Sequence, residues 1–205
     1  MNEILAAKLG YENKMISKGA RFIAGVDEVG RGPLAGPVVC CAVIMPLGEN
    51  DLIEGVDDSK KVSEKKRKIL AEEIKKRAIA YKICQIEPDE IDEINILEAT
   101  KKCMKACVDG LEIKPDVVLI DALEIATDIP QLGIVKGDVV SYTIGAASIV
   151  AKVYRDELME KYAEEYPGYF FEKNKGYGTK AHTDAIRRIG PCPIHRRTFI
   201  KNFLD

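Results

Sequence analysis

Hydrophobic residues recur along the chain in two patterns, short runs typical of strands and longer stripes typical of helices. Two runs rich in valine and isoleucine come first, over residues 21–28 and 37–45, and the glycines between them predict a hairpin. A third run, over 80–87, alternates enough to be a strand. Residues 117–122 are apolar except for one aspartate, a pattern typical of a central parallel strand, and a shorter strand is expected over 133–135.

Apolar residues at helical spacing predict four helices. The first begins after Ser63, a residue type that caps helices, and a long one starts at Pro88 and continues to about Leu111. The helix over 141–166 opens with small residues that allow close packing on a sheet. A short helix over 179–189 ends at a glycine and a proline, and the rest of the chain beyond residue 167 is expected to be loop.

Together these elements predict an α/β fold, in which a mixed five-stranded sheet is flanked by helices and followed by a small helical C-terminal extension. We expect a single domain over 1–205, with its core over 20–166 and a basic helical segment over 167–205. The 205 residues, 46% of them hydrophobic, are enough to bury a core and exclude a disordered chain.

The sequence also indicates where in the cell the protein is expected. The longest apolar run has eight residues, over 38–45, against the roughly 18 that a membrane helix needs. The N-terminus lacks the cationic flank and apolar core of a signal peptide. The six cysteines include the neighbours Cys40 and Cys41 and no C-x-x-C pair, so we expect reduced, buried thiols rather than disulfides or a zinc site. These features predict a soluble, cytoplasmic protein without a membrane segment.

Positive charge is concentrated in two blocks on a chain whose net charge is −2. Residues 60–77 contain nine basic and three acidic residues, and residues 173–205 contain eight basic and two acidic residues. A solvated helix face would explain the first block alone. Two separate blocks on an acidic body fit a clamp on a nucleic-acid duplex better, because phosphate neutralisation supplies most sequence-independent affinity.

Four carboxylates interrupt or end the predicted strands: Asp27, Glu28, Asp121 and Asp138. Strand interiors normally avoid such residues, and a carboxylate that leaves water needs a hydrogen bond, a cation or a metal. A single one is explained by a cap or a strand-end turn. Four together predict a shared site for Mg²⁺ or Mn²⁺, the hard ions that bind oxygen ligands. Without a nucleophilic triad, such a cluster favours metal-assisted phosphodiester cleavage.

One geometric objection concerns the first pair, since neighbours on an ideal strand point to opposite faces. Both Asp27 and Glu28 can contribute only where the strand ends or bulges. Gly30 and Gly32 follow immediately, and glycine tolerates the irregular backbone that such an ending requires. The glycines do not have the G-x-G-x-x-G spacing of a dinucleotide site.

A nucleophilic mechanism is the other chemistry that the residues offer. His182 and His195 are candidates for a Ser-His pair with Ser148, but nothing in their spacing favours it. We expect both histidines to bind phosphate or to cap helices instead.

Eight segments in a fixed order resemble the ribonuclease HII family: GVDEVGRGPLAGPVV, DDSKKVSEKKR, DEIDEINILEAT, VLIDAL, KGD, AASIVAKVYRD, KGYGTKAH and HRRTF. The likeness spans about residues 20 to 200, and its DEVGRG differs from the DESGKG-like form of the related ribonuclease HIII. It implies a ribonuclease H-like fold. It also implies endonucleolytic cleavage of RNA in RNA–DNA hybrids, including single ribonucleotides embedded in duplex DNA, with roles in primer and ribonucleotide removal.

The resemblance implies roles for the acids. Asp27, Glu28, Asp121 and Asp138 match the family's four catalytic residues, of which the first three are its usual metal-ion positions and Asp138 is expected to join a second metal. Residues 20–166 are then the catalytic core, and 167–205 the substrate-binding segment.

Further positions match the parts of the family that bind substrate. The turn Gly30, Arg31 and Gly32 matches the segment that recognises the ribose 2′-hydroxyl, the group that distinguishes RNA from DNA. Tyr177 matches a tyrosine that stacks on the adjoining deoxyribose, although an aromatic between glycines also suits a loop plug.

Contacts are also expected for Lys60, Ser148 and Asp156. Lys60 is expected to meet a phosphate near the cut, and Ser148 to do the same from the start of its helix. Asp156 is expected to form a helix-side salt bridge. The expected partner is nucleic acid, the expected state is a monomer, and no sliding-clamp motif is evident.

Two other function classes stay open at this point. A DNA nuclease or resolvase of the same fold would use similar acids without a ribose reader. A non-catalytic duplex-binding module would need the basic blocks but not the acids. Under the leading hypothesis water attacks on the 5′ side of a ribonucleotide and leaves a 3′-hydroxyl and a 5′-phosphate.

Overall fold

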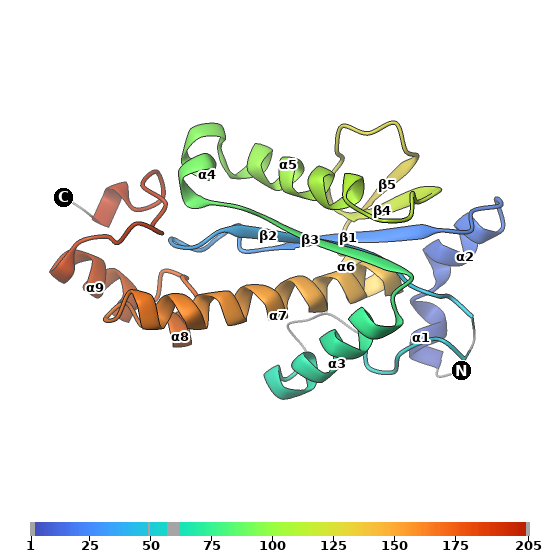
Figure 1. The fold of residues 1–205 in the computed structure, drawn as a ribbon, viewed down its shortest axis with the longest axis horizontal. Coiled ribbons are helices and arrows are strands. Elements are labelled where there is room, and N and C mark those ends of the chain that lie inside the picture. Colours follow the sequence, from blue (N-terminus) through green and yellow to red (C-terminus); the bar gives the residue numbers. More distant parts are fainter. Residues whose placement is uncertain (1–2, 49, 57–61, 204–205) are drawn as a thin grey trace.

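A mixed five-stranded sheet forms the centre of the protein (Figure 1). The computed structural model describes residues 3–48, 50–56 and 62–203. The strands are β1 (Ile23–Val29), β2 (Val38–Ile44), β3 (Ala80–Ile86), β4 (Val117–Asp121) and β5 (Gln131–Ile134). Their order across the sheet is β3-β2-β1-β4-β5, with β2 antiparallel to β1 and β3, and β4 parallel to β1 and β5. The predicted α/β fold with a mixed five-stranded sheet is confirmed.

Helices cover both faces of the sheet (Figure 1). α5 packs on one face with α4 before it, and α7 crosses the other face with α3 beside it. α1 and α2 lie at one end of the molecule, whereas α8 and α9 lie at the other. The helices are α1 (Glu3–Ala7), α2 (Gly10–Ile16), α3 (Glu64–Arg77), α4 (Pro88–Ile94), α5 (Ile96–Asp109), α6 (Gly137–Val140), α7 (Tyr142–Glu165), α8 (Phe171–Asn174), α9 (Lys180–Ile189) and the 3₁₀ helix Lys201–Phe203.

The backbone of β1 lies directly against the beginning of α7. A Cβ atom at Gly25 would lie 2.2 Å from the backbone carbon of Thr143 and 2.5 Å from the backbone nitrogen of Ile144. Only glycine permits two backbones to come this near. Residues 144–151 of α7 are all buried, as the predicted close packing of small residues on the sheet requires.

The predicted long helix from Pro88 is wrong, because two helices occupy this stretch. The chain breaks at Asn95, which has a left-handed φ of 69°. Its side-chain oxygen accepts hydrogen bonds from the N–H groups of Leu97 (3.0 Å) and Glu98 (3.2 Å) and so caps α5. The apolar residues continue at helical spacing through Asn95, so the sequence pattern gave no indication of this cap.

The N-terminal helices, for which the pattern made no prediction, hold the start of α7. Glu12 in α2 is fully buried. Its Oε1 accepts hydrogen bonds from the Ser141 hydroxyl (2.7 Å) and from the N–H of Thr143 (3.0 Å). A carboxylate at a helix N-terminus is favoured by the helix dipole. The helix that packs most closely on β1 is therefore fixed at its first turn by a residue from outside the predicted core.

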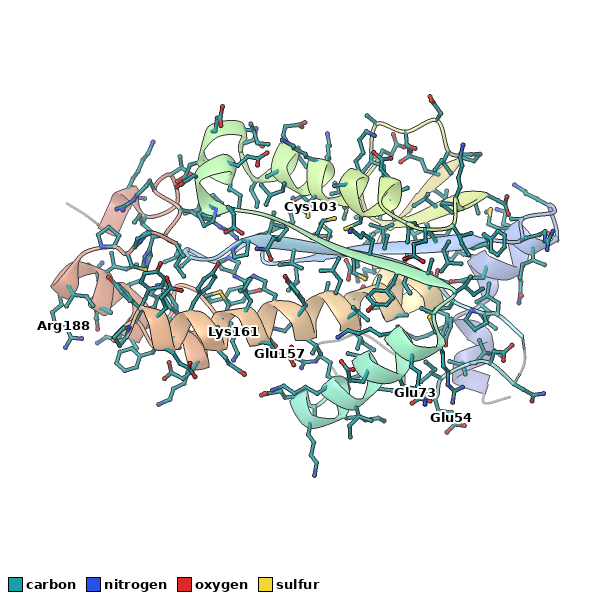
Figure 2. All side chains as sticks on the ribbon, viewed as in Figure 1. Glu54, Glu73, Cys103, Glu157, Lys161 and Arg188 are labelled. Carbon is teal, nitrogen blue, oxygen red and sulfur yellow. The ribbon has the colours of Figure 1, made fainter. Side chains whose placement is uncertain are left out.

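All six cysteines are free thiols, and only Cys84 is not fully buried. The Cys103 side chain lies between α5 and the sheet (Figure 2), where its thiol donates to the carbonyl oxygen of Cys84 (3.2 Å). The Cys107 thiol donates in the same way to the carbonyl oxygen of Cys40 (3.2 Å). The expectation of reduced, buried thiols is confirmed.

The segment after residue 167 is more ordered than predicted. It contains α8 between Phe170 and Lys175, both in the left-handed region, in addition to the predicted α9. Thr179 caps α9 by accepting from the N–H of His182 (3.3 Å), whereas Ser63 at the start of α3 makes no such bond within the part of the chain that the structure describes. Along the described ranges, no helix has both the length and the apolar character to cross a bilayer.

Candidate active site

Three carboxylates converge where the neighbouring parallel strands β1 and β4 end. One oxygen each from Asp27, Glu28 and Asp121 lies within 4.8 Å of the others. Asp27 and Glu28 are near the end of β1, and Asp121 is the last residue of β4. Because parallel strands deliver their carboxyl ends to one edge of a sheet, residues far apart in sequence meet here.

The pairing between β1 and β4 explains how two adjacent residues reach one site. The ladder stops at Val26 and Ile120, whereas β1 remains paired with β2 up to Val29. Beyond the last pair, the β4 side of β1 has no strand beside it. The Asp27 side chain turns along its own strand, since its Oδ1 accepts from the N–H of Glu28 (2.8 Å). The ending of the neighbouring strand, rather than a bulge in β1, thus answers the objection to this pair.

Asp121 is held by the connection that follows β5. Its Oδ1 accepts from the N–H of Gly137 (2.6 Å). Lys136 before this glycine and Ala122 after the aspartate have left-handed φ values of 57° and 52°. Such conformations cost about 1–3 kcal/mol each and cluster at functional sites. A Cβ at Gly137 would lie 2.6 Å from Ile144, so the sequence KGD places a residue without a side chain against the acid.

Asp138 was expected at the end of a strand, and this is wrong because it lies in the short helix α6. It lines the same cavity as the other three acids but is not among the three whose oxygens lie within 4.8 Å. The cavity has a volume of about 290 Å³. Its walls consist of Asp27, Glu28, Val29, Asp121, Asp138, Ser148, Lys152 and Tyr177.

Burial and mutual repulsion disfavour the ionised acids. Burial, followed by the charge of Glu28, raises the pKa of Asp27 well above its usual value, while a hydrogen bond from Ser148 opposes the shift. Burial and the charge of Asp121 also raise the pKa of Glu28, against the opposing effect of Arg31. Arg31 lies 3.4 Å from the Glu28 carboxylate. A cation in the cluster would relieve both the desolvation and the repulsion.

Ser148 and Lys152 face the acids from α7, one helical turn apart. Ser148 was predicted to contact phosphate, and in the structure its side chain bonds to Asp27. Lys152 was not predicted, and its Nζ also forms an ion pair with Asp156 (2.6 Å). Its i, i+4 spacing from Ser148 was the available signal. Asp156 also pairs with Arg67 (3.2 Å), which agrees with its expected helix-side salt bridge.

The GRG turn leaves β1 beside this cavity. Gly30 has a left-handed φ of 93° and is buried, whereas Gly32 is exposed. A Cβ on Gly32 would lie 3.8 Å from the ring of Tyr177, so the turn and the tyrosine are neighbours. Tyr177 itself is 44% exposed, which leaves its ring available to a ligand and disfavours the role of a loop plug.

The histidines do not bind phosphate, because both are fully buried. The N–H of Cys192 donates to Nδ1 of His195 (3.0 Å), so this histidine carries its proton on Nε2. That proton is donated to Nε2 of His182 (3.0 Å), whose own Nδ1–H donates to the carbonyl oxygen of Tyr177 (2.9 Å). The pair thus links the C-terminal loop to the backbone of Tyr177, and Ser148 lacks a histidine partner within the described ranges.

The histidine pair makes stability depend on pH. Burial lowers the pKa of His195 from its usual 6.5 to about 4 and lowers that of His182 as well. Between about pH 7 and pH 5 the histidines therefore bind protons in the unfolded chain but not in the folded chain. As the pH falls through this range, His195 lowers the free energy of unfolding by about 2 kcal/mol. Asp27 and Glu28, whose pKa values are raised, act in the opposite direction. We expect the free energy of unfolding of His195→Asn, measured by urea unfolding, to fall less between pH 7 and pH 5 than that of the parent protein. An equal fall in both proteins would contradict the lowered pKa of His195.

Lys60 and the second basic block were both expected to contact phosphate. Lys60 lies outside the described residues. In the second basic block, Arg196 is fully buried and does not face a duplex. The block therefore carries less surface charge than its sequence suggests.

A divalent cation fits the acidic cluster. Glu28 Oε2 is buried and has no hydrogen-bond partner among residues 3–48, 50–56 and 62–203. An unsatisfied buried carboxylate oxygen is costly unless an ion or water meets it. The donors are all oxygen atoms, the set that hard cations such as Mg²⁺ and Mn²⁺ prefer.

Comparison with known proteins points to one family. The family model of ribonuclease HII matches residues 24–202. The chain is 54% identical over 196 residues to ribonuclease HII of Caldanaerobacter subterraneus subsp. tengcongensis, which covers 95% of this chain and 80% of that protein. It is 51% identical over 194 residues to ribonuclease HII of Caldicellulosiruptor saccharolyticus, with 94% of each chain covered.

Solved structures show the same architecture. Ribonuclease H2 of Pyrococcus horikoshii superposes with a TM-score of 0.74 at 26% identity, over 89% of this chain and 97% of that one. Ribonuclease HII of Archaeoglobus fulgidus, solved in a complex with PCNA, gives 0.76 at 27% identity over the same shares. The chain therefore belongs to the ribonuclease HII family and is a ribonuclease H, an endonuclease.

Proposed function

We propose that this enzyme hydrolyses the RNA strand of RNA–DNA hybrids and cuts on the 5′ side of single ribonucleotides embedded in duplex DNA. The observation that carries the proposal is the placement of the GRG turn and Tyr177 beside the acidic cluster. A cluster of acids alone would suit any metal-assisted nuclease. An exposed, glycine-flanked turn next to the cluster adds a surface whose backbone can contact a sugar closely.

We assign the metal site to Asp27, Glu28 and Asp121, with Asp138 completing the cavity. Enzymes of the ribonuclease H family depend on divalent ions, and here Mg²⁺ or Mn²⁺ would supply an activated water and charge stabilisation at the leaving oxygen. The protein's own part is to hold these carboxylates in position through Ser148 and Gly137. We propose in-line attack that leaves a 3′-hydroxyl and a 5′-phosphate.

The GRG turn supplies the means to recognise a 2′-hydroxyl. The N–H groups of Arg31 and Gly32 have no hydrogen-bond partner among the described residues. Two free amides next to an exposed glycine can bond to a hydroxyl oxygen, which DNA lacks at this position. Tyr177 beside Gly32 offers a face for the sugar of the next nucleotide.

Lys152 and Ser148 give the cavity polar groups on the α7 side, and we propose that they and Lys60 meet the backbone near the cut. The basic residues of α3 and of the segment over 167–205 would hold the flanking duplex. We further propose that the enzyme works as a cytoplasmic monomer in replication and repair. The complex with PCNA belongs to the Archaeoglobus relative.

Two duplexes of identical sequence test the ribose preference. One carries a single ribonucleotide and the other is all DNA. We expect cleavage 5′ of the ribonucleotide with Mg²⁺ or Mn²⁺, and at least about 10³-fold slower cleavage of the all-DNA duplex, since a site built to bond a hydroxyl rejects a substrate without it. Gel analysis of the end-labelled strands measures both rates and the site of the cut.

Equal cleavage of the two duplexes would overturn the proposal and favour a DNA nuclease of the same fold. Cleavage of long hybrids without cleavage at the single ribonucleotide would retain the ribonuclease H activity and refute only the embedded-ribonucleotide substrate.

A further inference from the structure

We propose that two buried arginines, Arg155 and Arg196, are positioning residues that set the ribose selectivity of the GRG turn. Together they form a guanidinium frame beneath residues 30–37. The inference rests on the proposed function, in which this turn recognises the 2′-hydroxyl. Neither side chain reaches the acidic cavity, so both act through the backbone that they hold.

Arg196, from the HRRTF motif, holds the first part of the turn. Its NH2 group donates to the carbonyl oxygens of Gly30 (2.5 Å) and Gly36 (2.8 Å), and its NH1 group donates to that of Arg31 (2.9 Å). Its Nε also donates to Gly36 (3.0 Å). One planar fork thus fixes three carbonyl groups of a turn that is some 160 residues away in sequence.

Arg155, from α7, holds the second part. Its Nε donates to the carbonyl oxygen of Pro37 (3.0 Å) and its NH2 group to that of Ala35 (3.1 Å). Its NH1 group donates to the carbonyl oxygen of Lys175, two residues before Tyr177 (2.9 Å). A Cβ on Gly30 would lie 2.2 Å from Arg155 Nε, so the turn rests directly on this side chain.

Burying the two guanidinium groups of the frame costs folding free energy, which indicates that their geometry is needed. Both side chains have an exposed fraction of 0%, and neither forms an ion pair with a carboxylate in the described ranges. Burial lowers the pKa of Arg155 to about 10 and that of Arg196 to about 9, and the two charges repel each other. The hydrogen bonds that both groups donate to backbone carbonyl oxygens offset this cost.

The geometry of the peptide bond connects the frame to the substrate. In a trans peptide the carbonyl group and the following N–H point in opposite directions. Because the carbonyl groups of Gly30 and Arg31 point at the Arg196 guanidinium, the N–H groups of Arg31 and Gly32 point away from it, toward the exposed side of the turn. Two successive amides on one side form an anion- or oxygen-binding concavity. The frame therefore orients the two donors assigned to the 2′-hydroxyl.

The frame also fixes the distance between the turn and the acids. Arg155 lies on α7, the helix that carries Ser148 and Lys152 into the acidic cavity. The same rigid helix thus holds the Asp27 carboxylate at one point and the turn at another. A ribose held by the turn is thereby set at one place relative to the acids.

Arg196→Lys tests the proposal, because lysine keeps the charge but replaces the planar fork by a single ammonium group. The dissociation constants of the ribonucleotide-containing and all-DNA duplexes are measured by fluorescence anisotropy in EDTA, so that neither is cut. Cleavage of the first duplex is then measured with Mn²⁺. We expect the preference for the ribonucleotide duplex to fall about tenfold while the affinity for all-DNA duplex stays within about twofold. Arg155→Lys should act in the same direction.

Ile186→Ala is the matched control. Ile186 is buried in a hydrophobic cluster with Ala35 and Ile194 but makes no polar contact with the turn, so this variant loses stability and should keep the preference. Urea unfolding shows that each variant is folded at the assay temperature. If Arg196→Lys and Arg155→Lys keep the full preference while folded, the inference is wrong. If the unmodified enzyme itself binds and cuts both duplexes equally, the proposed function fails instead.

Discussion

Asp121→Asn is expected to abolish cleavage of a ribonucleotide-containing duplex, with a loss of about 10³-fold or more, while duplex binding changes little. The asparagine oxygen can still accept the hydrogen bond from Gly137 N–H, so the end of β4 keeps its place. What disappears is one negative oxygen of the three-carboxylate group. Because Asp121 raises the pKa values of Asp27 and Glu28, its removal also relieves repulsion in the folded protein. The variant should therefore be at least as stable as the parent without metal.

Three measurements separate this result from a folding defect. Initial cleavage rates are compared at saturating Mn²⁺, duplex affinity is measured in EDTA, and the rise in melting temperature on addition of Mn²⁺ is recorded for both proteins. The parent should be stabilised by Mn²⁺ and the variant much less. Asp128→Asn, which alters an exposed carboxylate outside the acidic cavity, serves as the control. Near-normal turnover of Asp121→Asn would remove this residue from the catalytic site.

Gly25→Ala is expected to reduce the free energy of unfolding by about 3 kcal/mol or more, a large effect for one methyl group. The added Cβ would lie 2.2–2.5 Å from backbone atoms of Thr143 and Ile144. Backbone in the first turn of a helix cannot rotate away as a side chain can, so α7 must move off β1. Since α7 carries Ser148 against Asp27, activity should decrease as well.

Gly10→Ala provides a matched substitution. A Cβ at Gly10 meets no atom within 4 Å, and this residue has no left-handed φ. It is the first residue of α2, where alanine should be neutral or stabilise by up to about 1 kcal/mol. Urea unfolding of the three proteins gives the comparison. A Gly25→Ala protein within about 1 kcal/mol of the parent would show that the two layers can separate without cost.

The sequence was most informative where a residue type conflicted with its surroundings. Asp121 at the end of an apolar run, and Asp27 with Glu28 at the end of another, revealed the acidic site because strands normally exclude such residues. The spacing of hydrophobic residues also predicted all five strands and α7. These signals are local, and the parallel arrangement of β1 and β4 follows from them through general packing rules.

Other features lacked a local signal. In the sequence, Arg196 and Arg155 resemble ordinary surface cations. Their burial could not be predicted, because it depends on backbone carbonyl groups that only the folded structure brings to them. Lys152 had only its i, i+4 spacing from Ser148 as a signal, and this spacing is not distinctive in a helix that is rich in charged residues. The break at Asn95 depends on a single left-handed residue within continuous apolar spacing.

The long sequence separation between Arg196 and the turn has a consequence for biosynthesis. A nascent chain acquires Asp27, Glu28, Asp121 and Asp138 well before its C-terminal loop leaves the ribosome. The three carbonyl groups that Arg196 holds have no such anchor until residue 196 has been translated. The carboxylates of the acidic cavity are thus synthesised early, whereas the turn that we propose to distinguish the two sugars gains its hydrogen bonds to Arg196 late, so an incomplete polypeptide lacks this anchor.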